Sequence, residues 1–543
     1  MATLRKGQGL RQSMAWLHTW SGLLVCWVLF LVFCGGTASY VKEEITLWMK
    51  PELHASLNEH VPATDAARRA MDFLQRQAPD AERWFITLPD DRRPTISVFW
   101  LRQPRAADAG KGNRARLESR TLDAATGNPV PGARDTRGGE FLYRLHFDLH
   151  YMPAIWARWI IGICTMFMFV AIISGVITHR RIFADFFTFR ARKGQRSWLD
   201  AHNATAVLAL PFHLMITYTG LVTLLFLYMP WGIQAVYNGD EKAFNAELAA
   251  RAPRVKAADV TAPLAPLGPM LTQAVAHWDG TLPARIAVER PNDANAIVSL
   301  TRDAGRNLTA QPPTMVFSGT TGTLQTTLGD DPAAASATRG VMVGLHVAHF
   351  APPLLRALLF LSGLAGCLMV ATGALLWAVK TRQSHARTIA ITGRTPFGLR
   401  LVESLNLGVI AGVPIAFAAY FWANRLLPTD MAHRSDMEIR AFFAAWVVVA
   451  LLAQWRPTRA MWRGWLWMAA ALFAGLPGLN ALTTTSHLGV TLVHGPAVVA
   501  GFDLTVLALG IGFGAAAWML GRPHGMRRTS GAARAAGGVG EMS

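Results

Sequence analysis

The chain has 543 residues, of which 52% are hydrophobic and only 16% are charged. This composition indicates an integral membrane protein rather than a soluble one. The formal net charge of +18 would suit a nucleic-acid-binding protein, but the placement of the charges, described below, argues against that class.

Eight apolar runs are long enough, at about 20 residues, to cross a bilayer. The first follows the basic stretch RKGQGLR and exceeds the apolar core of a signal peptide, about 7–15 residues, so we interpret it as an uncleaved anchor. The sequence therefore predicts a polytopic α-helical membrane protein with about eight transmembrane helices. The runs lie at 17–39, 154–178, 202–229, 353–379, 401–423, 439–455, 464–482 and 496–520.

The basic residues are concentrated on one side of these runs. If the N-terminus is cytoplasmic, the cytoplasmic segments hold 21 Lys and Arg and only three acids, which leaves 31 of the 52 bases and 31 of the 34 acids for the rest. This asymmetry is the positive-inside pattern, and it predicts that both termini are cytoplasmic. The segments are 1–16, 179–201, 380–400, 456–463 and 521–543.

Two long polar segments interrupt the runs on the outer side and share one internal order. The first has a helical stretch at 65–79, alternating stretches WFITL and TISVFW, and then TLDAATGNPV. The second has a helical stretch at 267–280, then ARIAVE, AIVSL and MVFSGTTGTL. Each therefore predicts a small α+β domain of one helix followed by three strands, the last with a Thr-Gly turn.

The flanking runs repeat as well, so the first 380 residues form two copies of span, outer domain, span. His18 precedes Gly36 by 18 residues, as His202 precedes Gly220. The later span of each copy is preceded by Leu-His and ends in a small-Gly pair. These pairs are Leu145-His146 and Leu345-His346, then Ser174-Gly175 and Thr372-Gly373. Internal duplication often places a functional site at the repeat interface.

The predicted order along the chain follows from these boundaries. It is a cytoplasmic N-terminus (1–16), a first span (17–39), a first periplasmic domain (40–152), a second span (153–179), a cytoplasmic loop (180–199), a third span (200–229), a second periplasmic domain (230–345), a fourth span (346–380), a cytoplasmic loop (381–400), four additional spans (401–520) and a cytoplasmic tail (521–543). The four additional spans do not resemble the repeated unit, and we assign them no chemistry.

Histidines gather at the span ends of the duplicated part. A single buried histidine is more often a packing residue, but eight in four helices favour a function, since polar side chains inside a membrane are costly. They are His18, His179 and His202 near the inner face, His146, His150, His346 and His349 near the outer face, and His213 close to mid-membrane.

Paired histidines in a helix bundle are typical of b-type heme ligation. Neutral imidazole binds iron through one ring nitrogen while the other donates a hydrogen bond. Two axial histidines leave no open position on the iron, which suits electron transfer. His202 and His213 are eleven residues apart, about three helical turns, so a straight helix would present both on one face about 16 Å apart. One helix would then serve two stacked hemes.

The axial pairing stays open at this level. His202 has possible partners at its own depth in His18 and His179, while His213 lies deeper than the outer histidines unless the third helix tilts. His179, next to Arg180 and Arg181, is equally explained as a residue among lipid head groups. The four cysteines all lie inside spans and form neither a disulfide framework nor a CxxC metal motif, so we interpret them as packing residues.

Several stretches resemble the PepSY-associated transmembrane helix family of bacteria. They are LHTWSGLL, YRLHFDLHYMP, SGVITHRRIFADFFTFR, SWLDAHNATAVLALPFHLMITYTGLV and LSGLAGCLMVATGALLW, in order within about residues 15–382. The two outer segments are similar to PepSY domains, which are small α+β modules. The C-terminal spans are matched only loosely.

The resemblance implies an inner-membrane oxidoreductase, a ferric-chelate reductase, that passes electrons through two b-type hemes to a ferric siderophore in iron uptake. It implies a quinol or cytosolic electron donor and periplasmic iron-uptake components as partners. The implied axial histidines are His18, His146, His150, His179, His202, His213 and His346. His349 lies outside the matched set.

Two other functions fit parts of the sequence. The PepSY-like domains could restrain a periplasmic peptidase or another partner, with the spans as anchors, although an anchor needs neither eight spans nor buried histidines. A metal or siderophore transporter would place acidic residues along the bundle interior, whereas these spans are rich in His and poor in Asp and Glu.

Overall fold

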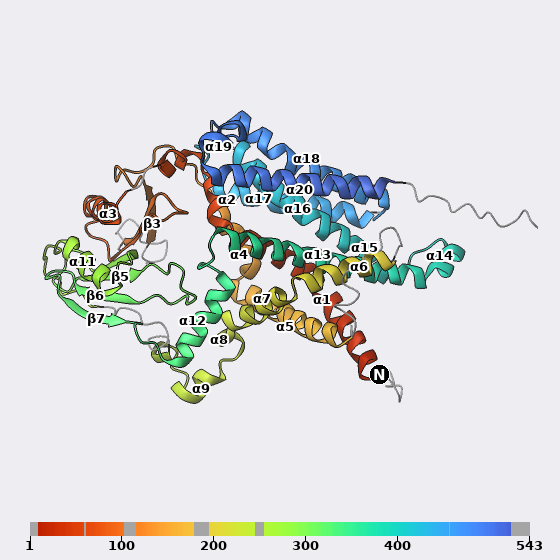
Figure 1. The fold of residues 1–543 in the computed structure, drawn as a ribbon, viewed down its shortest axis with the longest axis horizontal. Coiled ribbons are helices and arrows are strands. Elements are labelled where there is room, and N and C mark those ends of the chain that lie inside the picture. The colour runs from red at the N-terminus through yellow and green to blue at the C-terminus, as the bar shows by residue number, and fades with distance from the viewer. Residues whose placement is uncertain are drawn as a thin grey trace, which may run out of the picture.

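The computed structural model describes residues 9–58, 61–102, 116–178, 195–244, 255–455 and 457–522. A β-sheet with two helices lies at one end of a bundle of long helices, and the N-terminus lies at the opposite end of the bundle (Figure 1). We call the end of the bundle next to the sheet the sheet side, and the opposite end the far side.

Within the part of the chain that the structure describes, six helical stretches are long and apolar enough to cross a membrane. A bent pair, α6 (Gln195–Leu208) and α7 (Leu210–Thr223), makes a seventh if it is one span. The sixth predicted run, 439–455, is helical as part of α17 (Arg434–Trp455), which is not among these candidates. The six are α1 (Leu10–Ser39), α5 (Ala154–Thr178), α13 (Pro353–Ser384), the continuous stretch Phe397–Leu426, α18 (Arg459–Thr483) and α20 (Ala497–Gly521).

Three helix boundaries differ from the predicted spans. The first helix begins at Leu10 rather than at residue 17. The third span is not one straight helix, since α6 and α7 meet at a bend of 68°. Pro211 lies in the first turn of α7, where its missing N–H and fixed φ suit a helix start but not a helix interior. The fourth span begins at Pro353 rather than at 346, so His346 belongs to a separate helix, α12 (Ala334–Val347).

Both outer segments contain one helix followed by strands, with the predicted three strands in the first segment but four in the second. The first contains α3 (Ala63–Gln77), β1 (Arg83–Thr87), β2 (Ile96–Arg102) and β3 (Arg116–Leu122). The second contains α11 (Leu267–His277), β4 (Pro283–Glu289), β5 (Ile297–Arg302), β6 (Thr314–Ser318) and β7 (Leu324–Leu328).

The two segments do not form the separate domains that we expected. Their strands make one seven-stranded sheet in the order β3-β2-β1-β4-β5-β6-β7, so the first strand of each segment pairs with the other, antiparallel. Alternate strand residues such as Trp84, Ile86 and Ile286 are buried in one core with residues of α3 and α11, because successive side chains of a strand point to opposite faces. Across the junction, Arg83 forms an ion pair with Glu289, its partner in the register.

The C-terminal helices pack along the duplicated part, above it in Figure 1. Trp48 of α2 (Lys42–Met49) donates a hydrogen bond to Asp503 of α20 (2.8 Å), and Trp27 of α1 donates one to Asn406 (2.9 Å). One hydrophobic core joins α1, α4 (Gly138–Asp148), α5 and α13 to these helices. The remaining elements are η1 (Pro51–Leu53), η2 (Ala55–Asn58), α8 (Leu225–Tyr228), α9 (Trp231–Tyr237), α14 (Ala386–Thr392), α15 (Phe397–Asn406), η4 (Leu407–Ala411), α16 (Gly412–Leu426) and α19 (Leu488–His494).

Candidate functional site: two histidine pairs

The first pair lies on the far side, where His18 of α1 faces His202 of α6. The centroids of the two imidazole rings are 6.2 Å apart and their planes are inclined by 62°. A metal–imidazole nitrogen bond is about 2 Å long, so two histidines on opposite sides of one metal place their ring centroids about 6 Å apart. The far-side pair therefore has the separation of two ligands to one metal ion.

The backbone that holds these two rings is the same in both copies of the repeat. His18 Nδ1 donates to the carbonyl oxygen of Ala171 on α5 (2.8 Å), and His202 Nδ1 donates to that of Met369 on α13 (2.9 Å). Each carbonyl lies four residues before the glycine of a small-Gly pair, Gly175 or Gly373. The repeat inferred from the sequence is therefore also a repeat of side-chain geometry.

The second pair lies on the sheet side, where His146 ends α4 and His346 ends α12. The two imidazoles are close enough to interact electrostatically. Burial first, and then the neighbouring His346, lowers the pKa of His146 to about 4, and burial lowers the pKa of His346 to about 4. Both imidazoles are therefore neutral at physiological pH, which is the form that binds metal.

All four histidines are held in one tautomer. His146 Nδ1 donates to the Tyr143 carbonyl oxygen. Thr219 donates its own proton to Met215 O (2.7 Å), so its oxygen accepts from His346 Nδ1 (3.2 Å). In each ring, as in the far-side pair, Nδ1 carries the proton, which assigns the lone pair to Nε2. A hydrogen bond on the second nitrogen is typical of metal-binding histidines.

Glycines make room for each of these side chains. A Cβ atom at Gly175 or Gly373 would lie 3.0 or 3.1 Å from Cε1 of His18 or His202, and one at Gly220 would lie 3.0 Å from Cε1 of His346. At Gly35 it would lie 3.1 Å from Cβ of His146. These distances are shorter than an ordinary carbon–carbon contact of about 3.5–4.0 Å, so the close approach of helix and imidazole requires glycine.

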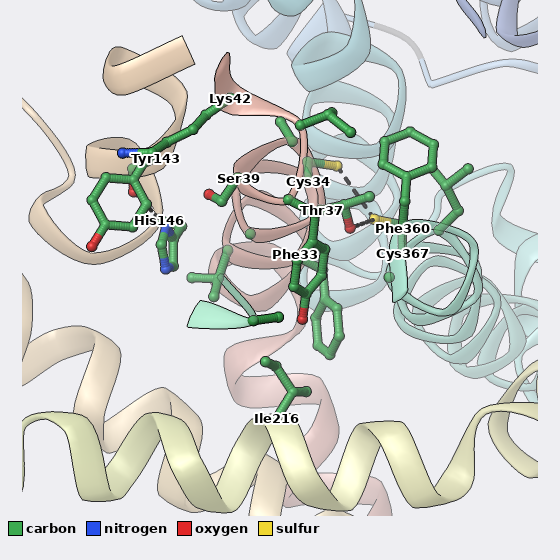
Figure 2. A pocket seen from close by; sticks show the side chains of 18 of the residues that line it. Phe33, Cys34, Thr37, Ser39, Lys42, Tyr143, His146, Ile216, Phe360 and Cys367 are labelled. Carbon is green, nitrogen blue, oxygen red and sulfur yellow. Dashed lines mark hydrogen bonds between the residues drawn. The ribbon is translucent and has the colours of Figure 1, made fainter. Parts of the chain in front are cut away.

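A large cavity of about 3440 Å³ connects the sheet-side pair to the sheet. His146, Tyr143, Phe33 and Ile216 are among its lining residues, and Figure 2 shows these four side chains around the pocket. Cys34 of α1 and Cys367 of α13 also line it, with sulfur atoms 3.7 Å apart. Both are free thiols.

The other predicted ligands are not brought into these pairs. His150 follows α4 in the turn before α5 and stacks on Phe443 of α17 (ring centroids 5.7 Å apart). His213 is fully buried beside Phe33, and neither of its ring nitrogens has a hydrogen-bond partner among the described residues. His349 lies in the α12–α13 connection and lines the cavity. His179 lies outside the described residues.

The comparison with protein families agrees with this architecture. The model of the PepSY-associated TM region matches residues 15–380, which is more than half of the chain and contains both histidine pairs. The chain belongs to the PepSY-associated transmembrane family. The chain is also similar to an uncharacterized protein of Pseudomonas aeruginosa, PA4219, with 26% identity over 371 residues, which are 64% of this chain and 87% of the relative. The C-terminal helices α15 to α20 lie outside the family match.

The sequence did not reveal which residues orient the histidines of this PepSY-associated protein. Gly175, Gly373 and Gly220 were recognised as repeat positions, yet nothing in the sequence tied them to His18, His202 and His346. The signal was their conserved place in the two copies, because a glycine kept at matching positions often marks close packing. In the first copy the packing glycine is Gly35, next to the predicted Gly36, which has no atom within 4 Å of an added Cβ.

Proposed function

We propose that this protein is a heme-b electron-transfer protein of the bacterial inner membrane that reduces a ferric siderophore or another ferric chelate in the periplasm. One observation carries the proposal. Four imidazoles form two pairs: the far-side rings are 6.2 Å apart, and His146 and His346 lie near each other on the sheet side. Each ring keeps Nδ1 on a hydrogen-bond acceptor, and each pair takes one histidine from each copy of the repeat.

The residues of both pairs fit heme. The donor set is two neutral imidazoles, and the 6.2 Å separation of the far-side rings suits two axial ligands. Glycines leave the space beside three of the rings that a Cβ atom would otherwise crowd. We assign one heme to His18 and His202 and a second to His146 and His346, and we leave His150 and His213 out of the ligand set.

His18 with His202, and His146 with His346, would hold the hemes, and a heme bound there would supply one-electron transfer. The carbonyl oxygens of Ala171 and Met369 hold the far-side imidazoles in the binding tautomer, and the Tyr143 carbonyl and Thr219 hydroxyl do the same on the sheet side. Apolar residues of α1, α5 and α13 pack into one core between the two levels. No side chain needs to take up a proton for electrons to cross.

The direction of electron flow follows from the charge distribution. The basic excess at 1–16, 179–201 and 380–400 favours a cytoplasmic far side and therefore a periplasmic sheet. A quinol or a cytosolic donor would reduce the far-side heme, and the chelate would be reduced from the sheet side, where the cavity opens toward the loops of the sheet. Ferrous iron binds hard oxygen ligands less tightly than ferric iron, so reduction would release it for uptake.

The test is an optical spectrum of the purified, full-length protein, oxidised and then reduced with dithionite, followed by mixing of the reduced protein with a ferric chelate. We expect the α-band of a bis-histidine b-type heme, two hemes per chain, and rapid reoxidation by the chelate with formation of ferrous iron. Absence of heme after expression with added heme precursor would refute the proposal. If heme is present and reducible but no ferric chelate reoxidises it, the electron-transfer role would stand and the proposed substrate would be refuted.

A further inference from the structure

Three arginines surround the sheet-side mouth of the cavity at one end of the sheet. Arg285 is near the start of β4, Arg302 ends β5, and Arg306 lies in the β5–β6 loop; all three line the cavity. The register places Arg302 opposite Pro283 and Arg285 opposite Thr301, with an irregularity between Pro283 and Arg285, so both arginines belong to the same end of the β4–β5 strand pair. Asp303 N donates to Leu282 O (2.9 Å) and fixes the loop beside the start of β4.

These arginines differ from their neighbours in having no carboxylate partner among the described residues. Arg92 and Arg356, which line the same cavity, both form ion pairs with Glu44, and Arg93 pairs with Asp90. By contrast, no ion pair or side-chain hydrogen bond of Arg285, Arg302 or Arg306 occurs in the described parts of the chain, and Arg302 Nε is buried without a partner.

The charge of the cavity mouth is positive even when its acids are counted. Asp91 and Asp303 also line it, beside the paired Asp90, Glu43 and Glu44. Against these five carboxylates stand eight bases, but Lys42 and Arg158 also pair with Glu140 and Asp148 outside the lining, so one positive charge remains in excess. The bases are Lys42, Arg92, Arg93, Arg158, Arg285, Arg302, Arg306 and Arg356.

The β5–β6 loop is also fixed against the helix that carries His346. Ala310 N donates to Gly340 O (2.9 Å), and a Cβ atom at Gly344 would collide with the Leu308 carbonyl oxygen at 1.5 Å. His346 follows Gly344 by two residues. The loop of Arg306 therefore rests directly on the end of α12 that presents a histidine of the sheet-side pair.

We propose that Arg285, Arg302 and Arg306 form the binding site for an anionic ferric chelate, one with carboxylate groups at its periphery, and that this site holds the chelate beside the sheet-side histidine pair. The planar guanidinium group donates two parallel hydrogen bonds to a carboxylate, and three such groups without internal partners satisfy a multiply charged ligand. This inference rests on the proposed function in one respect: that function is the reason to expect ferric iron in the bound chelate. The binding site itself requires no electron transfer.

The experiment measures equilibrium binding of a gallium(III) complex to the full-length protein in nanodiscs of zwitterionic lipid. Gallium(III) resembles ferric iron in charge and size but is not reduced, so binding is separated from reduction. We expect the anionic gallium citrate complex to bind, and a neutral gallium trihydroxamate to bind much more weakly. Each of Arg285→Gln, Arg302→Gln and Arg306→Gln should weaken citrate-complex binding about tenfold, as expected for loss of a charged hydrogen bond.

The matched control is Arg76→Gln on α3, an exposed arginine that does not line the cavity and whose loss changes the net charge equally. It should leave binding unchanged. Equal weakening by Arg76→Gln, or unchanged binding in the triple arginine variant, would overturn the site. Equal binding of the neutral complex would overturn its selectivity for anions.

A phospholipid phosphate is the other anion that could reach these arginines. Repeating the titration in nanodiscs with anionic lipid distinguishes the two sources. If the wild type still binds the citrate complex in anionic lipid, the result supports the chelate site. If anionic lipid abolishes this binding, the arginines bind a lipid head group and the proposal is overturned. Because gallium binding does not require heme, a protein without heme that binds the complex would refute the proposed function and leave this site standing.

Discussion

At the scale of single residues, the four paired histidines are defined by what fixes their second nitrogen. A backbone carbonyl accepts from Nδ1 of His18, His146 and His202, and Thr219 accepts from that of His346. Among the described residues His213 has no such acceptor, although it is fully buried. Hydropathy reveals only the depth of a histidine in the membrane. It therefore does not distinguish a histidine with a hydrogen-bonded Nδ1 from one without such a bond.

The glycines opposite the far-side pair give a test at this scale. Gly175→Ala adds a methyl group 3.0 Å from Cε1 of His18, so the imidazole must shift. If this shift introduces about 1.4 kcal/mol of strain, heme on the far-side pair should dissociate about tenfold faster. Transfer of heme to an acceptor such as apomyoglobin measures this rate, and the sheet-side heme should be unaffected.

Gly36→Ala is the matched control, because an added Cβ there has no atom within 4 Å and the residue lies in a membrane helix of the same copy. Its heme dissociation should match that of the wild type. The same acceleration in both variants would mean that the effect comes from helix perturbation and not from contact with His18.

At the scale of elements, local periodicity predicted the helices and strands but not their partners. The alternation in WFITL and ARIAVE shows two half-buried strands, yet nothing local indicates that β1 pairs with β4 across nearly 200 residues. Likewise, the spacing of His202 and His213 placed both on one face only for an unbroken helix. The 68° bend between α6 and α7 removes that relation, and Pro211 was its visible signal.

The junction of the two half-sheets can be tested by crosslinking. Phe85 and Ala287 are direct partners in the antiparallel register of β1 and β4, where Cα atoms lie about 4.5–5.5 Å apart. A Phe85→Cys and Ala287→Cys double variant should form a disulfide under mild oxidation, detected by mass spectrometry of the linked peptides.

The control combines Phe85→Cys with Ser299→Cys. Ser299 is the partner of Ala287 on the next strand, β5, so it lies two strands away from Phe85 and beyond disulfide reach. Crosslinks of equal yield in the two double variants, or none in the first, would show that the segments do not share one sheet.

At the scale of the whole molecule, duplication accounts for the two pairs, because each pair joins matching positions of the two copies. The sequence showed the copies and seven candidate ligands, but it could not choose the pairs, since that depends on how the copies face each other. It was also silent about the C-terminal helices, which dock through buried polar groups. Arg434 and Glu438, for example, are fully buried and form an ion pair next to Thr136.

This buried pair predicts how the C-terminal helices contribute to stability. Glu438→Leu leaves Arg434 buried without its carboxylate, which we expect to destabilise the protein by about 3–5 kcal/mol and to lower its melting temperature. Adding Arg434→Met to Glu438→Leu should restore most of the loss, because two apolar residues can replace a buried ion pair.

Thermal unfolding in detergent checks this prediction. Asp72→Leu, which removes a carboxylate from an exposed ion pair with Arg68, serves as control and should change stability by less than about 1 kcal/mol. A melting temperature of Glu438→Leu equal to that of the control would contradict a structural role for the buried pair.

The central claim is that two histidine pairs, His18 with His202 and His146 with His346, hold one heme each. The most direct measurement is the heme content and reduced optical spectrum of the four single His→Ala variants and of His213→Leu. We predict that His18→Ala and His202→Ala lose or alter the same heme, that His146→Ala and His346→Ala affect the other, and that His213→Leu retains both. A wild-type protein without heme, or a loss that groups the histidines in any other way, would contradict the account.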